Sequence, residues 1–579
     1  MKKIISWAKY IPLLIVPLLV IIYQQNITKN IYFSDPDYAY ILNGLNINIL
    51  KLPLYSDHPG VPLTMLSAIG LRVIYWFSGS STDIQTDVLT NPAFYEVRLQ
   101  LILFSLIIAV TLFSGYWIYK VTKNIYLGII SQAIPLLFST SIALASANYM
   151  PDAMLIIILH LFIILTVQYV VKETGKEDTT KEKWLFPVLC GLALSVKIII
   201  LPILILPVIL LGMNIKKIVQ FSGVTLLSFI VFTLPVMEQY PSMMRWFLSL
   251  FTHSGIYGGG SATIINPQTY FKNIKFIVSD DQLMAAMMIL TLILLPFLYY
   301  LKRKGKIQIN DILPKLLIAL IITQVISILI VSKTFDGKSY YLIVTYALTT
   351  ASFVVSLVIL IKYLKLSKLI VAAILTCFLT FSIWVNWKNY MNEYAGRYKA
   401  QNESIELQQF LNGHNDYNVI TNNAYSLNKN QALLFGLAYS RAHEERLMQL
   451  YPKAYFYNVI PGKFTNWYRE VVPDQVFVNK KALLVDTYLN DIEKADLQNR
   501  GYTLKLLFSN RTKAVYELNR AINAQQKLNY KAFIAAKMKA IYLDEKWLNS
   551  IKEKAIKNGI SLDSMVYLDA KWMIDTYGK

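Results

Sequence analysis

Long apolar runs separated by short polar connections fill the first 390 residues of the chain, and the pattern turns polar and mixed afterwards. The runs are about 20 residues long, which is the length that an α-helix needs to cross the hydrocarbon core of a bilayer. We therefore predict a polytopic α-helical membrane protein. The predicted single spans lie near residues 4–22, 99–118, 125–145, 153–171, 217–236, 282–300, 312–331, 341–361 and 369–387.

The stretch 185–212 differs from the other runs because it is longer than one span and contains Lys197, Pro202 and Pro207. Lysines flank both of its ends, and lysine-rich connections favour the cytoplasmic side of a membrane. A single crossing would place one end outside, so we predict two short, broken half-spans that turn back at Lys197. The flanking lysines are Lys181, Lys183, Lys216 and Lys217.

Counting this hairpin as two crossings gives about 11 transmembrane helices, with a cytoplasmic N-terminus and an extracytoplasmic C-terminal region. Basic clusters then fall in the cytoplasmic connections, and many of the acidic residues fall in the opposite loops. The apolar segment 61–77 contains Arg72 and is short, so we expect it to lie at the membrane interface instead of crossing.

The region after residue 390 reads as a separate fold. Short β-rich runs alternate with helical patterns, and the last two runs, 502–508 and 513–518, predict a β-hairpin. From about residue 521 the pattern is helical, with a break at Asn558-Gly559. We therefore predict a transmembrane domain over 1–390, a soluble extracytoplasmic α/β domain over 391–520 and a helical tail over 521–579.

Composition supports the membrane assignment. Hydrophobic residues make up 55% of the 579 residues and charged residues only 16%, whereas soluble domains carry about 25% charged residues. The two cysteines lie in apolar runs, which excludes a disulfide scaffold. The net charge of +21 comes with no basic–aromatic nucleic-acid motif, so we expect no nucleic-acid partner.

The first outer loop contains the most informative polar motif, Ser34-Asp35-Pro36-Asp37-Tyr38. Two carboxylates at this spacing can share a divalent cation such as Mg or Mn, or one of them can act as a general base. A structural interpretation is also open, because Asp35 suits a helix N-cap, Pro36 the first helical position and Asp37 the first turn. The two interpretations are compatible.

Three further outer positions could carry chemistry. His58 precedes Pro59 in a proline-rich turn, and as a candidate it would offset an anionic phosphate; as a lone histidine it would have no role. Asp152 follows Pro151 at the start of a span, where simple helix initiation is the alternative. Lys197 is an ionisable residue at membrane depth, which by default indicates function.

Five motifs follow one another at the predicted outer ends of the spans. They are Ser34-Asp35-Pro36-Asp37-Tyr38, His58-Pro59-Gly60-Val61-Pro62-Leu63, Asn148-Tyr149-Met150-Pro151-Asp152, Gly191-Leu192-Ala193-Leu194-Ser195-Val196-Lys197 and Ser339-Tyr340-Tyr341-Leu342. In order and sidedness, over residues 1–390, they resemble the polyprenyl-phosphate-sugar-dependent membrane glycosyltransferases of the GT-C fold, which include protein O-mannosyltransferases and the lipid A aminoarabinose transferase. The chain departs from the family pattern at three places. Gly60 stands where the family has a proline, and Ser195-Val196 stands where it has Leu-Thr. The arginine that the family has ahead of Pro151 is missing.

The resemblance implies that a sugar moves from a polyprenyl-phosphate donor to a hydroxyl of a lipid, glycan or protein acceptor. The reaction would take place on the extracytoplasmic face of the plasma (cell inner) membrane, in the making of a cell-envelope glycan. Asp35 is then the first candidate for base or metal ligand, with Asp37 and Asp152 as its partners in catalysis or metal binding. His58, Lys197 and Lys338 are candidates for binding the donor phosphate.

Two other classes of protein remain open. A flippase or secondary transporter of polyprenyl-linked glycans would also be polytopic, but it should carry its ionisable residues in the middle of the membrane. A non-catalytic membrane assembly protein would keep its function after loss of the loop carboxylates.

Overall fold

The structure is a computed structural model. It describes residues 10–26, 34–306, 312–335, 337–364, 367–414, 416–422, 428–458, 463–471, 473–477, 481–486, 497–511, 513–520, 530–558 and 561–577. The chain forms two compact units. We call Met1–Asn30, Ala39–Gln85 and Ala93–Tyr398 the helical unit, and Ile31–Tyr38, Thr86–Pro92 and Lys399–Lys579 the C-terminal unit.

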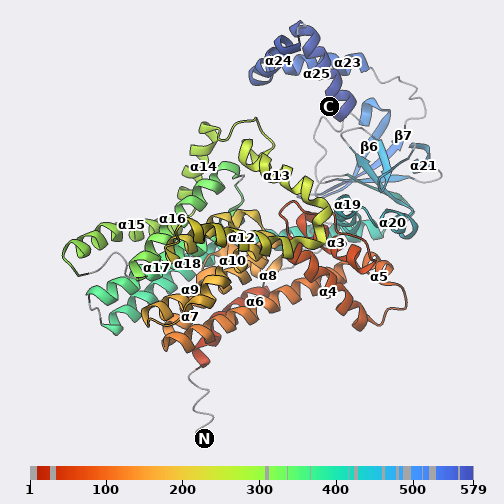
Figure 1. The fold of residues 1–579 in the computed structure, drawn as a ribbon. Helices are drawn as coiled ribbons and strands as arrows, with labels where there is room; N and C mark the ends of the chain where they lie inside the picture. The colour runs from red at the N-terminus through yellow and green to blue at the C-terminus, as the bar shows by residue number, and fades with distance from the viewer. Residues whose placement is uncertain are drawn as a thin grey trace. The chain divides into compact units, whose positions relative to one another are not determined.

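The helical unit is built from long apolar helices (Figure 1). Seven helices among the described residues are long and apolar enough to cross a membrane, or eight if one bent pair is counted as a span. The prediction of a multi-span α-helical membrane protein is thus confirmed in outline. The seven are α4 (Val61–Ser78), α6 (Pro92–Thr122), α9 (Pro151–Thr174), the run Ile215–Thr252, α15 (Gln282–Arg303), α16 (Ile312–Thr334) and the run Ser339–Lys362.

The run Ile215–Thr252 comprises α12 (Ile215–Thr233), the short helix Leu234–Gln239 and α13 (Tyr240–Thr252), and α17 (Ile343–Leu364) lies in the last run. Several predicted spans differ in detail. The predicted span 4–22 appears as the shorter apolar helix Ile11–Gln24, within the part of it that the structure describes. The predicted span 369–387 lies in α18 (Lys368–Asn412), many of whose side chains there fall outside the described set.

The bent pair lies where a single span was predicted over 125–145. Helix α7 (Ile125–Ala133) runs into a short 3₁₀ turn containing Pro135, and the chain continues as α8 (Ser139–Ala147) at an angle of 81°. Proline lacks the N–H group that would continue the helical hydrogen bonds, which explains the position of the bend.

The stretch around Lys197 forms the predicted hairpin. Helix α10 (Thr180–Val196) ends where Lys197 adopts an extended conformation (φ −159°, ψ 129°), and the chain continues through the 3₁₀ helix Ile198–Leu204 into α11 (Ile205–Leu211). Thr180 and Lys183 at one end line the same hollow as Leu211 and Met213 at the other. Both basic flanks therefore lie together, and the chain reverses at Lys197.

Helices α9 and α10 lie antiparallel, and ion pairs join them near both ends. Lys172 pairs with Glu182 at 2.8 Å, and Lys197 pairs with Asp152 at 2.7 Å. The start of α9 and the end of α10 therefore occur at the same end of the helical unit, and this end carries the candidate site.

The described strands of the C-terminal unit form one seven-stranded sheet in the order β4-β3-β2-β1-β5-β7-β6. The central strand β1 is parallel to β2 and β5, and the other pairings are antiparallel. The bounds are β1 Asn418–Asn422, β2 Ala454–Asn458, β3 Lys463–Asn466, β4 Arg469–Val471, β5 Ala482–Asp486, β6 Tyr502–Ser509 and β7 Ala514–Arg520. The predicted hairpin is thus β6–β7.

Helices complete the C-terminal unit. The end of α18 packs Leu407 against Leu483 and Val515 on one face of the sheet. Helices α19 (Lys429–Ser440), α20 (Glu444–Leu450) and α21 (Pro473–Phe477) lie between strands in the chain, and α23 (Tyr530–Leu543), α24 (Glu545–Asn558) and α25 (Leu562–Tyr577) share a small core of their own. Helix α24 ends at Asn558, as predicted.

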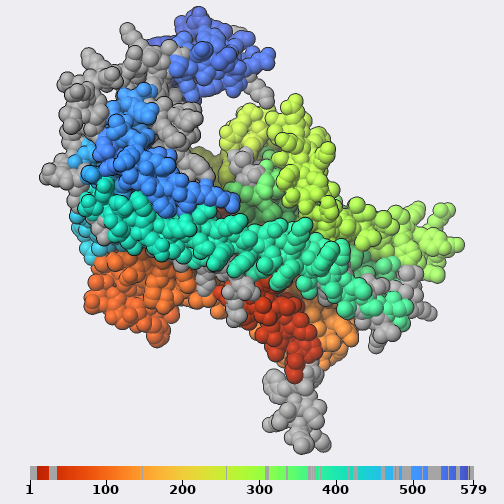
Figure 2. Space-filling view, turned by 180° about the vertical axis from the view of Figure 1, so that it is seen from behind, coloured from red at the N-terminus to blue at the C-terminus, as the bar shows by residue number. Residues whose placement is uncertain are grey.

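The division between the two units falls inside α18, between Tyr398 and Lys399. Helix α18 runs through residue 390 without a break, and the last segment of the C-terminal unit begins at Lys399. Figure 2 shows α18 in green to turquoise. The C-terminal unit also includes Ile31–Tyr38 and Thr86–Pro92 from the predicted first outer loop.

Candidate functional site

A buried ion pair lies at the centre of the candidate site. The Lys197 ammonium donates to both carboxylate oxygens of Asp152, at 2.8 Å to Oδ1 and 2.7 Å to Oδ2. The two side chains are only 5% and 1% exposed. Asp152 occupies the first turn of α9 after Pro151, where the positive end of the helix dipole stabilises a carboxylate. Local structure therefore fixes the position of each partner.

The turn that carries His58 is paired with the break at Lys197. The Gly60 N–H donates to the Val196 carbonyl at 3.1 Å, and the Ile198 N–H donates to the His58 carbonyl at 3.0 Å. Gly60 has a φ of +65°, and a Cβ there would lie 2.2 Å from the Tyr40 ring. Proline fixes φ near −65°, so the departure from the family pattern at Gly60 has a structural reason.

His58 is held in an aromatic environment. Its ring lies 5.5 Å from the Trp246 ring in an edge-to-face arrangement and 6.1 Å from the Tyr257 ring. Burial, and then the positive charges of Lys197 and Lys338, lower the pKa of His58 from 6.5 to about 3. His58 is therefore neutral at physiological pH, and it can offer a hydrogen bond to an anion but no charge.

Two tyrosines at the start of the run Ser339–Lys362 complete the surroundings of Lys197. The Lys197 ammonium lies 4.8 Å from the Tyr341 ring centroid and 5.3 Å from that of Tyr340. Lys338 is exposed, and its ammonium lies 5.9 Å from the Tyr340 ring. The structure thus brings together four of the six site residues predicted from the sequence: His58, Asp152, Lys197 and Lys338.

An apolar cavity of about 300 Å³ borders His58 and Lys197. Its walls come from the segment after Lys197, from α13 and the loop that follows it, and from the end of α16. Apart from His58, Lys197 and Lys333, the lining is aliphatic and aromatic, and it includes Ile198, Leu201, Trp246, Leu250, Tyr257, Leu329 and Tyr341. Such a cavity fits a ligand that joins a hydrocarbon chain to a polar group.

The residues of this cavity that are not among the predicted site residues include Lys333, Trp246 and Tyr257. The Lys333 ammonium donates to the Leu250 and Phe251 carbonyls at 2.6 and 2.7 Å, in the last turn of α13. The Tyr257 hydroxyl is hydrogen-bonded to the Tyr341 hydroxyl. The position of Lys333 at the end of an apolar run could have marked it as a site residue. The same pattern is common for lysines whose ammonium group only extends to the membrane interface.

The acidic motif of the predicted first outer loop belongs to the C-terminal unit. Ser34–Tyr38 forms a π-helical turn (η2) that packs against α19. Asp37 is 1% exposed, whereas the Asp35 side chain lies outside the described set. Asp37 and Asp152 are therefore carried by different compact units, so the predicted grouping of Asp35, Asp37 and Asp152 does not appear within either unit.

Of the three carboxylates predicted to hold a metal ion, the structure describes the side chains of Asp37 and Asp152. Over the residues that the structure describes, no group of three or more His, Cys, Asp or Glu side chains could hold a metal ion. Both oxygens of Asp152 face the Lys197 ammonium, and a positively charged neighbour at this distance disfavours a cation as a second partner. Asp152 therefore does not fit the role of metal ligand.

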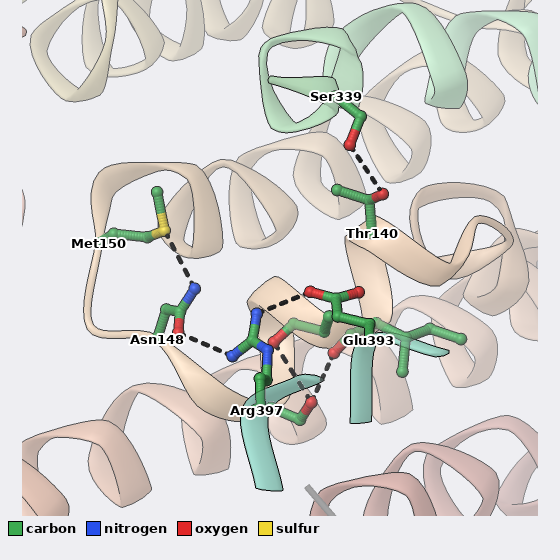
Figure 3. Close-up of polar contacts among 9 residues, drawn as sticks. Thr140, Asn148, Met150, Ser339, Glu393 and Arg397 are labelled. Carbon is green, nitrogen blue, oxygen red and sulfur yellow. Dashed lines mark hydrogen bonds and ion pairs between the residues drawn. The ribbon is translucent and has the colours of Figure 1, made fainter. Parts of the chain in front are cut away.

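One face of α18 supports the turn that precedes Asp152 (Figure 3). The Arg397 guanidinium donates to the Asn148 amide oxygen at 3.1 Å and to the Glu393 carboxylate at 2.8 Å. Asn148 in turn donates to the Met150 sulfur at 3.5 Å. An arginine is missing from the sequence just ahead of Pro151, and the tertiary structure brings one to this turn from α18.

The same face of α18 also holds the other end of α8. The Asn386 side chain donates to the Leu137 carbonyl at 2.9 Å and accepts from the Ser139 N–H at 3.3 Å. Tyr390 packs against Ala143 in the middle of α8. Thr140 is hydrogen-bonded to Ser339 at 3.2 Å, next to Lys338 (Figure 3). Helix α8 is therefore fixed between α18 and the site.

No protein-family model, curated protein or solved structure matches this chain.

Proposed function

We propose that the chain is a membrane glycosyltransferase of the GT-C type that transfers a sugar from a polyprenyl-phosphate donor to a hydroxyl acceptor. The observation that carries the proposal is the apolar cavity beside His58 and Lys197. A hydrocarbon wall next to cationic and hydrogen-bonding groups suits a ligand made of a lipid chain and a phosphate. The class of acceptor, whether lipid, glycan or protein, stays open in this proposal.

In this reaction the leaving group is a phosphate anion, which needs positive charge and hydrogen-bond donors as it departs. Lys197 and Lys338 would supply charge, and neutral His58 would supply a hydrogen bond. Asp152 would act as a positioning residue, since its carboxylate holds the Lys197 ammonium in place. This role replaces the catalytic role that the sequence suggested for Asp152.

Asp35 remains the proposed base, on the strength of the family resemblance. It would accept the proton of the acceptor hydroxyl as the new bond to the sugar forms. If the reaction uses Mg or Mn, Asp35 and Asp37 are the carboxylates proposed to hold it. The ion would balance charge on the phosphate. Asp152 is not included among the proposed ligands, because both of its carboxylate oxygens accept hydrogen bonds from the Lys197 ammonium.

We propose eleven crossings of the plasma membrane, with the candidate site on the extracytoplasmic side. The chain reversal at Lys197 supports two half-spans there. The contacts of α4 support an interfacial helix instead of a twelfth crossing, because Ser67 is hydrogen-bonded to Tyr149 at 2.9 Å and Gly70 lies against Leu99. Tyr149 lies in the connection just before α9, and Leu99 lies in the first third of α6, at the end that carries Asp152.

The transport alternative has no observation of its own in its favour. A transporter should bind its substrate near the middle of the bilayer. Asp152 lies in the first turn of α9 and Lys197 directly after α10, at the ends of these helices.

The test is sugar transfer by purified protein from a polyprenyl-phosphate sugar to a panel of hydroxyl acceptors. Replacing Asp35→Asn should lower the rate about a hundred- to ten-thousandfold, since the amide keeps the size of the side chain but cannot accept a proton. Asp83→Asn, at an exposed aspartate of the same loop, is the matched control and should keep normal turnover. Transfer by Asp35→Asn within a few-fold of the unchanged protein would show that Asp35 only begins a helix.

A further inference from the structure

A second cavity, of about 250 Å³, lies in the other half of the helical unit. Leu313, Leu316 and Leu320 at the start of α16 line it, whereas residues 329–333 at the end of α16 line the first cavity. In the same way, residues 347–358 of α17 line the second cavity, and Tyr341, ahead of α17, lines the first. The two cavities therefore belong to opposite ends of α16 and α17.

The walls of the second cavity are almost entirely hydrocarbon. The side chains come from α6, α7, α9, α16, α17 and the segment 203–206, and only Thr122, Ser131 and Thr166 among them carry a polar group. Thr122 and Ser131 donate their hydroxyl protons to carbonyls of their own helices, Ile118 and Gly128, both at 2.7 Å. The cavity therefore has few polar groups that could form hydrogen bonds with water.

This chemistry selects the kind of occupant. A buried water needs two to four polar partners, and apolar cavities of about 150 Å³ in proteins stay dry and bind small hydrocarbons. The second cavity is larger than that, and it lies between helices that are apolar enough to cross a membrane. The hydrocarbon available to such a cavity is the chain of a membrane lipid.

The residues that flank the cavity add a charge preference. Lys123 follows Thr122 on α6, Lys315 lies between Leu313 and Leu316 on α16, and Lys362 lies one turn beyond Val358 on α17. On α9, Val171 is followed by Lys172 and Glu173, and Lys172 pairs with Glu182. The flanks on α6, α16 and α17 are thus basic, which suits an anionic head group.

We propose that the second cavity is a binding site for an acyl chain of an anionic phospholipid, whose head group lies against the lysines at this end of the bundle. The lipid comes from the leaflet at the basic ends of the helices. This site is separate from the cavity assigned to the glycosyl donor, and it does not depend on the proposed reaction. Its occupant fills the space between helices and so stabilises the bundle.

The first experiment uses the whole protein, purified in detergent and stripped of lipid. Phosphatidylglycerol, phosphatidylethanolamine and a polyprenyl phosphate are added separately, and bound lipid is counted by native mass spectrometry while the melting temperature is recorded. We expect one phosphatidylglycerol to be retained and to raise the melting temperature. Equal retention of phosphatidylethanolamine, or displacement of phosphatidylglycerol by polyprenyl phosphate, would overturn the assignment.

A cavity-filling variant tests the location of the lipid. Ala351→Phe places a ring in the cavity and should weaken phosphatidylglycerol binding at least tenfold, and Ala347→Leu is a smaller change at a second lining position. The matched control is Ala109→Phe on the exposed side of α6, which should bind as the unchanged protein does. Binding of normal strength in folded Ala351→Phe or Ala347→Leu protein would show that the lipid lies elsewhere.

Discussion

At the scale of single residues, Lys197 and Asp152 form a pair in which each charge depends on the other. Both side chains are almost fully buried, and the ammonium meets both carboxylate oxygens. Removing charges from water is costly, so a buried pair adds little net stability compared with two apolar side chains of similar size. Removing one partner alone leaves an uncompensated buried charge. Replacing one partner or both therefore separates the effect of the Lys197–Asp152 pair on stability from its effect on activity.

We expect the single change Asp152→Leu to lower the free energy of unfolding by about 3–5 kcal/mol, because Lys197 loses its partner. The double change Asp152→Leu with Lys197→Met should regain most of that stability, since no buried charge remains. Neither protein should transfer sugar. Unfolding of the protein in detergent measures its stability, and a sugar-transfer assay measures its activity. A double variant as unstable as the single one would contradict the pairing, and an active double variant would contradict the role proposed for Lys197.

At the scale of elements, the long helix α18 acts as a support for the site. Asn386, Tyr390, Glu393 and Arg397 recur every three or four residues and so share one helix face. This face contacts both ends and the middle of α8, which leads into the turn before Asp152. The position of Asp152 therefore depends on a helix far away in the sequence.

Arg397→Ala should lower the free energy of unfolding by about 1.5–3 kcal/mol, because Arg397 is only 15% exposed and makes hydrogen bonds assisted by its charge. It should also lower kcat for sugar transfer, since the turn that holds Asp152 becomes looser. Arg98→Ala is the matched control, because Arg98 is exposed and its described contacts, a hydrogen bond to the Phe94 carbonyl and a cation–π contact with the Phe94 ring, stay within its own helix. Normal kcat in Arg397→Ala would show that α18 supports stability alone.

At the scale of the whole molecule, the distribution of charge predicts which side of the membrane each connection faces. Reporter fusions after Lys304 and after Lys399 should report opposite sides, cytoplasmic and extracytoplasmic, because three predicted crossings separate them. A fusion after Lys216 is the matched control and should report the same side as Lys304. If Lys304 and Lys399 reported the same side, the eleven-crossing topology would be wrong.

The C-terminal unit includes more than the tail of the chain. The Arg446 guanidinium donates to the Thr86 hydroxyl at 2.9 Å, and the Tyr451 hydroxyl donates to the Leu89 carbonyl at 2.9 Å. With η2 packed on α19, two segments of the predicted first outer loop belong to this unit. The acidic motif is therefore held by a fold that forms about 400 residues later in the chain.

The sequence alone determined the features that depend on neighbouring residues. The length of the apolar runs predicts helices that can span a membrane, the lysines on both flanks predict the reversal at Lys197, and alternating apolar residues around a short turn predict the β6–β7 hairpin. These signals are local because helix length, membrane sidedness and turn formation are decided within a few tens of residues.

The tertiary structure decided which of the candidate residues meet. The sequence marks Asp152 and Lys197 separately, and only the packing of α9 against α10 joins them. The sequence does not indicate that Arg397 contacts Asn148, that Lys333 caps the C-terminal end of α13, or that the acidic motif packs against α19. Each of these contacts joins residues far apart in the chain, and a contact of that kind depends on how whole helices pack, which no local pattern specifies.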